Sequence, residues 1–238
     1  KKLLVIGFSV LSLSLFSDDK NDFEVYKIDD DKVRLASEII KKLETSHLVK
    51  KNYVDIKNEA FVEFLNRIDP NKAVFTSEEV GEFVQKNYLS ETVAEDLTLA
   101  FNVFNYYSKR YLQRYDKQID FLNTLDESNL NTERKLERDL SELKRLDTIE
   151  ELESLWVDLS TNDIIQLMLS ENPLDDAIQK TIKRMDNQLN YFKQTRNEDV
   201  FNIFMNSVAS IYGPHTSYMS PKNSEDFDIN MSLSLEGI

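Results

Sequence analysis

Residues 94–125, AEDLTLAFNVFNYYSKRYLQRYDKQIDFLNTL, carry the strongest periodic pattern in this 238-residue chain. Apolar and aromatic side chains recur there at steps of three and four: Leu97, Phe101, Phe104, Tyr107, Tyr111, Tyr115, Ile119 and Leu122. Such spacing places side chains on one face of an α-helix. The pattern predicts one helix roughly 45 Å long at ~1.5 Å per residue. We expect the chain to leave that helix between Leu125 and Thr132.

The sequence around this segment is also typical of helices. Between Gly81 and Gly213 the chain has no glycine, and Pro173 is its only proline there. Shorter apolar stripes predict four further helices, through Ala36, Ile39, Ile40 and Leu43; through Phe61, Phe64, Leu65 and Ile68; through Ile178, Ile182, Met185, Leu189 and Phe192; and through Phe201, Phe204, Val208 and Ile211. We expect the last two to pack on each other as a hairpin. The predicted class is mainly α, a multi-helix domain with a long central helix.

Helix starts are marked by capping residues. Thr76 with Glu79 and Thr148 with Glu151 fit the capping box, in which each side chain satisfies a free backbone amide. Asn197 is expected to cap another helix, and Asp69-Pro70 to end one. The sequence shows no internal repeat of fixed period.

Composition limits the possible functions. The chain is 41% hydrophobic, which suits a globular domain, and it contains no cysteine. Cysteine nucleophiles, disulfides and thiolate metal sites are therefore excluded. The two histidines, His47 and His215, have no metal-ligand spacing, so we predict neither metal nor cofactor. The formal charge of −14 argues against nucleic acid as a partner and is typical of a solvated acidic surface.

The first residues resemble a targeting segment. Lys1 and Lys2 precede an apolar run over 3–16, and polar residues follow at Ser17. This pattern predicts a secretory signal peptide over 1–17 and a linker over 18–30, with an uncleaved membrane anchor as the alternative. The absence of an initial methionine suggests a fragment or a shifted start.

The pattern changes again at residues 213–238, GPHTSYMSPKNSEDFDINMSLSLEGI. Pro214 and Pro221 end the helical pattern, because proline lacks the amide donor that a helix needs. Apolar residues then alternate over 231–235, which predicts a half-buried strand followed by a turn at Gly237. We expect this segment to connect the helical domain, 31–212, to a further domain.

This terminal segment resembles the tail-specific protease branch of the C-terminal processing peptidases. Weaker similarity extends through residues 65–75, 96–110 and 197–201, with Ile68-Asp69-Pro70-Asn71 and Trp156 at comparable places. The resemblance implies that 213–238 holds the connector and first strand of a truncated PDZ domain. It also implies that Gly237 and Ile238 belong to an incomplete loop for binding a peptide carboxylate. Gly213 replaces an aspartate usual in the family, so no carboxylate role transfers there.

The resemblance implies a periplasmic serine endopeptidase with a serine–lysine mechanism that recognises apolar carboxyl-terminal tails of exported proteins. Both catalytic residues would lie downstream, so this chain would contain none and would be inactive alone. Its helical domain would dock substrate or an adaptor protein, and would meet a membrane only through the signal segment or an anchor. The alternative is a non-enzymatic exported helical binding module.

Three other groups of residues have simpler explanations than catalysis. Ser217, with Thr216 and His215 beside it, is expected to form backbone-bonded loop contacts rather than a nucleophile and its base. The acidic pairs Asp175-Asp176, Glu78-Glu79 and Glu150-Glu151 are expected to stabilise helix starts. The aromatic residues over 101–115 could form a peptide or sugar platform, but helical spacing favours the core.

Overall fold

The computed structural model describes residues 25–130, 135–136, 140, 143–220, 224–225, 229 and 231. Seven helices run through these ranges, and no strand occurs within them. They are α1 (Asp30–Ser46), α2 (Tyr53–Ile68), α3 (Ser77–Leu89), α4 (Val93–Thr124), α5 (Ile149–Leu169), α6 (Leu174–Phe192) and α7 (Asn197–Tyr212). The prediction of a mainly α domain is confirmed.

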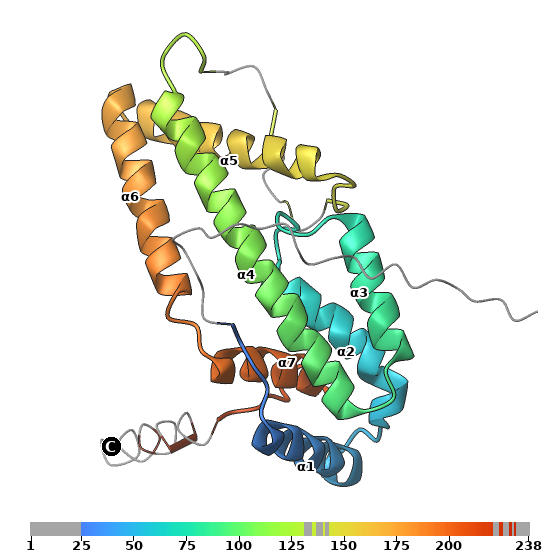
Figure 1. Ribbon diagram of the computed structural model, residues 1–238. Coiled ribbons are helices and arrows are strands. Elements are labelled where there is room, and N and C mark those ends of the chain that lie inside the picture. The colour runs from blue at the N-terminus through green and yellow to red at the C-terminus, as the bar shows by residue number, and fades with distance from the viewer. Residues whose placement is uncertain are drawn as a thin grey trace, which may run out of the picture.

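Helix α4 forms the axis of the molecule (Figure 1). Its 32 residues match the predicted central helix, and the chain leaves it at Leu125. Helices α5 and α6 pack around its carboxyl-terminal half, while α1, α2, α3 and α7 gather around its amino-terminal half. One long helix therefore connects two groups of shorter ones.

Each group of helices encloses its own hydrophobic cluster. The larger cluster joins α1, α2, α3, α7 and the first half of α4, and includes the fully buried rings of Phe61, Phe64 and Phe201. The smaller cluster joins the end of α4 to α5 and α6; its buried members are Leu122, Leu125, Ile164, Ala177, Ile178 and Met185. The apolar stripe of α4 thus serves two cores in succession.

The predicted hairpin of the last two helices is wrong. Helix α6 packs against α4 and α5, whereas α7 packs chiefly against α2. Both helices have a buried apolar face, but the connection between them turns α7 away from α6 (Figure 1). Apolar periodicity indicates that a helix has a buried face, but it does not indicate which other helix covers that face.

Most predicted caps are present. Thr76 and Glu79 form a reciprocal capping box at α3, and Thr148 and Glu151 form another at α5. A third, formed by Thr92 and Glu95 at α4, was not predicted. The predicted cap at Asn197 is wrong, since Asn197 is the first residue of α7 and its Oδ1 accepts a hydrogen bond from the Lys27 backbone at 3.0 Å.

The predicted signal peptide over 1–17 lies outside the described residues. So do residues 232–238, with Gly237 and Ile238 among them. Met231, where the predicted strand would begin, is helical rather than extended. Among the described helices, none has the length and apolar character needed to span a membrane.

Candidate functional site

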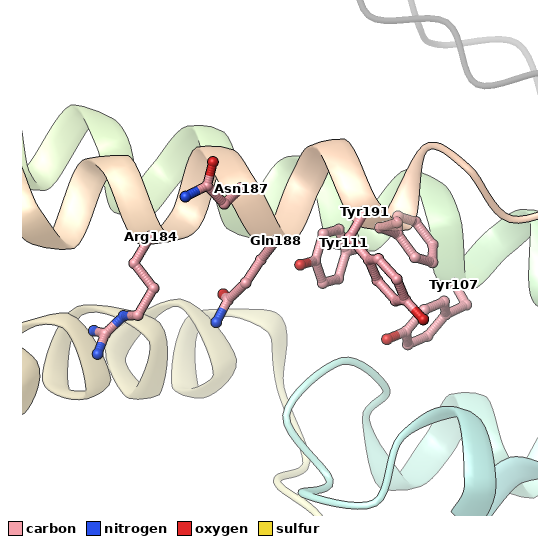
Figure 2. A pocket seen from close by; sticks show the side chains of 7 residues that line it. Tyr107, Tyr111, Arg184, Asn187, Gln188 and Tyr191 are labelled. Carbon is pink, nitrogen blue, oxygen red and sulfur yellow. The ribbon is translucent and has the colours of Figure 1, made fainter.

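A groove lies between α4 and α6, at the level where one hydrophobic cluster gives way to the other. It has a volume of about 490 Å³. Its walls are Tyr107 and Tyr111 from α4 and Arg184, Asn187, Gln188, Tyr191 and Phe192 from α6. Figure 2 shows the three tyrosines gathered at one end and Arg184 and Gln188 pointing toward α5 at the other. We call this the aromatic groove.

The aromatic rings hold one another in place. The ring centroids of Tyr111 and Phe192 are 4.5 Å apart, and those of Tyr107 and Phe192 are 5.7 Å apart. Tyr107 and Tyr111 follow each other at 6.1 Å along α4. These distances are in the range of favourable aromatic contacts. Tyr191 is different, because 77% of its surface is exposed.

Tyr107 and Tyr111 are neutral hydrogen-bonding groups at neutral pH. Burial raises the pKa of Tyr107 and of Tyr111. Burial also raises the pKa of Tyr115 to about 12, and a hydrogen bond from its hydroxyl to Asp186 at 2.5 Å adds to the effect. A flat aromatic face with a hydroxyl at its edge can contact an apolar chain and still satisfy a polar group.

A polar hollow of about 400 Å³ continues the aromatic groove toward α5. It shares Tyr111, Arg184 and Gln188 with the groove, and its other walls are Asn71, Arg114, Tyr115, Gln118, Leu159, Asp163 and Met185. We call it the arginine hollow. Arg184 forms a 2.5 Å ion pair with Asp163, and Arg114 Nε donates to Gln118 Oε1 at 3.1 Å.

At its other end the aromatic groove opens into a larger depression of about 1080 Å³ beside α7. Tyr107, Tyr191 and Phe192 line both. The three depressions share lining residues in turn, so together they form one continuous concave surface.

The loop before α3 positions one wall of the arginine hollow. Asp69 is 2% exposed and accepts backbone hydrogen bonds from Ala73 at 2.9 Å and Phe75 at 3.2 Å. The indole nitrogen of Trp156 donates to the Ala73 carbonyl at 2.7 Å. Asp69 and Trp156, both noted in the sequence, therefore meet at one loop and hold Asn71 beside α4.

The aromatic residues of α4 divide between core and groove. Phe101 and Phe104 are buried, as expected. Tyr107, Tyr111 and Tyr115 are half-buried and also line the depressions. The core expectation is thus confirmed for the first half of that aromatic segment, and the platform alternative stays a prediction for the second half.

The hydroxyl segment after α7 forms a structural contact. The Thr216 hydroxyl lies 2.9 Å from His47 Nε2, and the Val49 backbone N–H donates to His47 Nδ1 at 3.0 Å. Ser217 is exposed, and the described residues contain no hydrogen bond between it and either histidine. The loop is thus attached to the end of α1 by a side-chain contact, and among the described residues the expected hydrogen bonds from Thr216 and Ser217 hydroxyls to nearby backbone are not formed.

The acidic pairs occupy the first turns of α3, α5 and α6, where they oppose the helix dipole as predicted. Within the described ranges no cluster of three histidine, aspartate or glutamate side chains could hold a metal ion.

Sequence reasoning missed the arginines of the hollow. Arg114 and Gln118 follow Tyr107 and Tyr111 at steps of three and four, so they lie on the same face of α4. A cation on an otherwise aromatic stripe was the available signal. The sequence contains no comparable signal for Arg184 or Asn71, because these residues reach α4 only through the packing of α6 and of the loop before α3.

The described residues thus form an all-helical domain with one continuous concave surface along α4 and α6. The chain belongs to the family of the tail-specific protease N-terminal domain, whose model matches residues 39–222. It is 29% identical over 211 residues to the tail-specific protease of Haemophilus influenzae (strain ATCC 51907 / DSM 11121 / KW20 / Rd). That alignment covers 85% of this chain and 30% of the relative. The family resemblance is confirmed.

Proposed function

We propose that this chain is the amino-terminal part of a periplasmic tail-specific serine endopeptidase, and that its helical domain docks the protein substrate or an adaptor. The family match and the name of the Haemophilus relative support the protease assignment. The chain spans about 30% of the relative's length, so catalysis would belong to other parts of the protein.

One observation carries the docking role: tyrosines line a groove at a place where a purely structural helix pair would bury its apolar side chains completely. Elsewhere α4 contacts its neighbours through Leu97, Phe101 and Leu122, all of which are buried. At the groove Tyr191 stands largely exposed among other rings. Exposed tyrosine beside partly buried aromatic residues is typical of protein-binding surfaces.

The remaining parts of the proposal rest on the family resemblance. A PDZ module beginning near Gly237 and Ile238 would capture an apolar carboxyl-terminal tail on backbone amides. A serine activated by a lysine base would cleave the peptide bond, with burial lowering the lysine pKa toward working pH. The signal segment would direct the protein to the periplasm.

The test uses the full-length protein and the exposed tyrosine of the groove. Tyr191→Ser should slow cleavage of a folded protein with an apolar carboxyl-terminal tail several-fold, because that substrate must dock beyond the catalytic site. Cleavage of a short labelled peptide should be unchanged. The measurement is initial rate against substrate concentration for both substrates.

The matched control is Tyr88→Ser on α3, since Tyr88 is 70% exposed and lies outside the groove. Equal rates for the two variants on the folded substrate would refute the docking role. A full-length protein with no peptidase activity would instead favour the exported binding module.

A further inference from the structure

We infer that the arginine hollow binds the terminal carboxylate of a peptide whose apolar side chains lie along the aromatic groove. The inference rests on the proposed docking function and names the chemistry of the docked segment. It assigns the helical domain a carboxylate site of its own, built from Arg114 and Arg184.

Arg114 has binding capacity that the protein itself does not use. Its Nε donates to Gln118, and the described residues provide no hydrogen-bond partner for its two terminal nitrogens. The guanidinium lies in the wall of the hollow, and burial lowers its pKa. A carboxylate supplies two acceptor oxygens in a geometry that matches a guanidinium, so it can bind these nitrogens through charged hydrogen bonds.

The charge of the hollow is complementary to an anion. Arg114 and Arg184 face it with Asp163 as the acidic group among its lining residues. Asp69 also acts on Arg114 electrostatically, but it is paired with Arg145. Asp186 nearby accepts the Tyr115 hydroxyl. The lining residues therefore carry one excess positive charge on a chain of net charge −14.

Neutral donors complete the lining. Asn71 and Gln188, which carry side-chain amides, and Tyr111, which carries a hydroxyl, also line the hollow. Gln118 is already committed, because its Nε2 donates to the Trp156 carbonyl and the Ser160 hydroxyl. Arginines with neighbouring amide and hydroxyl donors form a set that suits a carboxylate and has few acceptors for a cation.

The arginine hollow lies at one end of the three depressions that share lining residues in turn, which favours a chain terminus over an internal acidic side chain. Tyr115, whose hydroxyl is hydrogen-bonded to Asp186, and Met185 line the hollow, and both pack in the smaller hydrophobic cluster with Ile119 and Leu122. An occupant that reaches the hollow can extend from it along the aromatic groove, past Tyr111, Tyr107 and Phe192. A peptide lying there would present apolar side chains to rings and its last residue to the arginines.

The experiment measures binding of labelled hexapeptides to the 238-residue chain by fluorescence anisotropy. The first peptide alternates leucine and alanine and has a free carboxyl terminus. The second is the same peptide as a carboxyl-terminal amide. The third is an amide with one central glutamate. We expect the free acid to bind at least about ten-fold more tightly than either amide, as for a charged hydrogen bond.

Variants locate the site. Arg114→Gln should weaken binding of the free acid by about ten-fold and leave binding of the amide unchanged. Arg184→Gln should also weaken binding of the free acid. Because Arg184 is exposed, this variant should stay folded, so it still tests the site if Arg114→Gln unfolds the chain. Lys183→Gln removes the same charge from an exposed position outside the hollow and should bind as the parent does.

Equal binding of acid and amide would overturn the inference, and so would equal losses for Arg184→Gln and Lys183→Gln. Tight binding of the central-glutamate amide would assign the site to acidic side chains and overturn the terminal-carboxylate assignment. The two proposals can fail separately. If Tyr191→Ser impairs docking while the free acid and the amide bind equally, the proposed docking function holds and only the carboxylate site is refuted.

Discussion

At the scale of single residues, Asp69 has the most consequential position. Its carboxylate accepts two backbone hydrogen bonds from the following loop and pairs with Arg145, whose side chain is only 10% exposed. The same loop accepts the indole hydrogen bond of Trp156. One carboxylate thus joins the end of α2, the start of α3 and the segment leading into α5.

We expect Asp69→Ala to lower the free energy of unfolding by about 3–5 kcal/mol, because it leaves the buried Arg145 without its counter-ion. Urea unfolding followed by circular dichroism measures the change. Asp175→Ala, at an exposed position in the first turn of α6, should stay within about 1 kcal/mol of the parent. Similar losses for the two variants would show that Asp69 is not a structural centre.

At the scale of elements, α4 depends on its first turn. Thr92 Oγ1 accepts from the Glu95 backbone N–H at 3.2 Å. The Glu95 carboxylate accepts in return from the backbone of Glu91 at 2.6 Å and of Thr92 at 3.1 Å. These contacts satisfy amides that have no partner within the helix. They fix where the longest element of the domain begins.

Thr92→Ala should destabilise the domain by about 1 kcal/mol through loss of this cap. The control is Thr98→Ala on the same helix, where the hydroxyl only donates to the Ala94 carbonyl at 2.7 Å. That substitution should be neutral or slightly stabilising, because alanine has the higher helix propensity. Thermal unfolding of both variants measures these effects. An unchanged melting temperature for Thr92→Ala would contradict the role assigned to the cap.

The same cap predicts a dependence on pH. Hydrogen bonds from the Glu91 and Thr92 backbones lower the pKa of Glu95, so folding favours its charged form. This stabilisation is present above the unfolded-state pKa of about 4.3 and is lost as pH falls through the lower folded-state pKa. Glu95→Ala should therefore lower the melting temperature at pH 7 and lower it less at pH 3.

Glu38→Ala is the control for this titration, since Glu38 is exposed on α1 away from any helix start. At pH 7 the loss of melting temperature in Glu95→Ala should exceed that in Glu38→Ala. A Glu95→Ala deficit that is as large at pH 3 as at pH 7 would mean that the charge on Glu95 does not contribute.

At the scale of the whole molecule, the domain is two unequal clusters joined by α4. The cluster around α2 and α7 contains several fully buried phenylalanines, while the one around α6 is built from a few aliphatic side chains and Met185 within the described residues. The aromatic groove and the arginine hollow lie where the two meet. A site at such a junction can widen or narrow if the smaller group of helices moves.

We expect the two clusters to differ in local stability. Backbone amides in α6 should exchange with solvent faster than those in α2 and α7, because less apolar surface must be exposed to open that part. Native-state hydrogen exchange followed by mass spectrometry resolves these helices. Equal protection in α6 and α7 would indicate a single cooperative unit.

The sequence by itself determined the helical class, the length of α4, the capping boxes of α3 and α5, and the existence of buried faces on α6 and α7. Each of these depends on residues near one another in the chain, through periodicity or through a side chain reaching three residues along the backbone. The family was also readable from the sequence, because its terminal motif is local.

Only the tertiary structure decided that α6 covers α4 instead of α7, that Asp69 and Trp156 hold one loop, and that Asn71, Arg114 and Arg184 surround one hollow. These arrangements join residues tens of positions apart. They follow from which apolar faces bury one another most completely, and that choice depends on the whole set of helices at once.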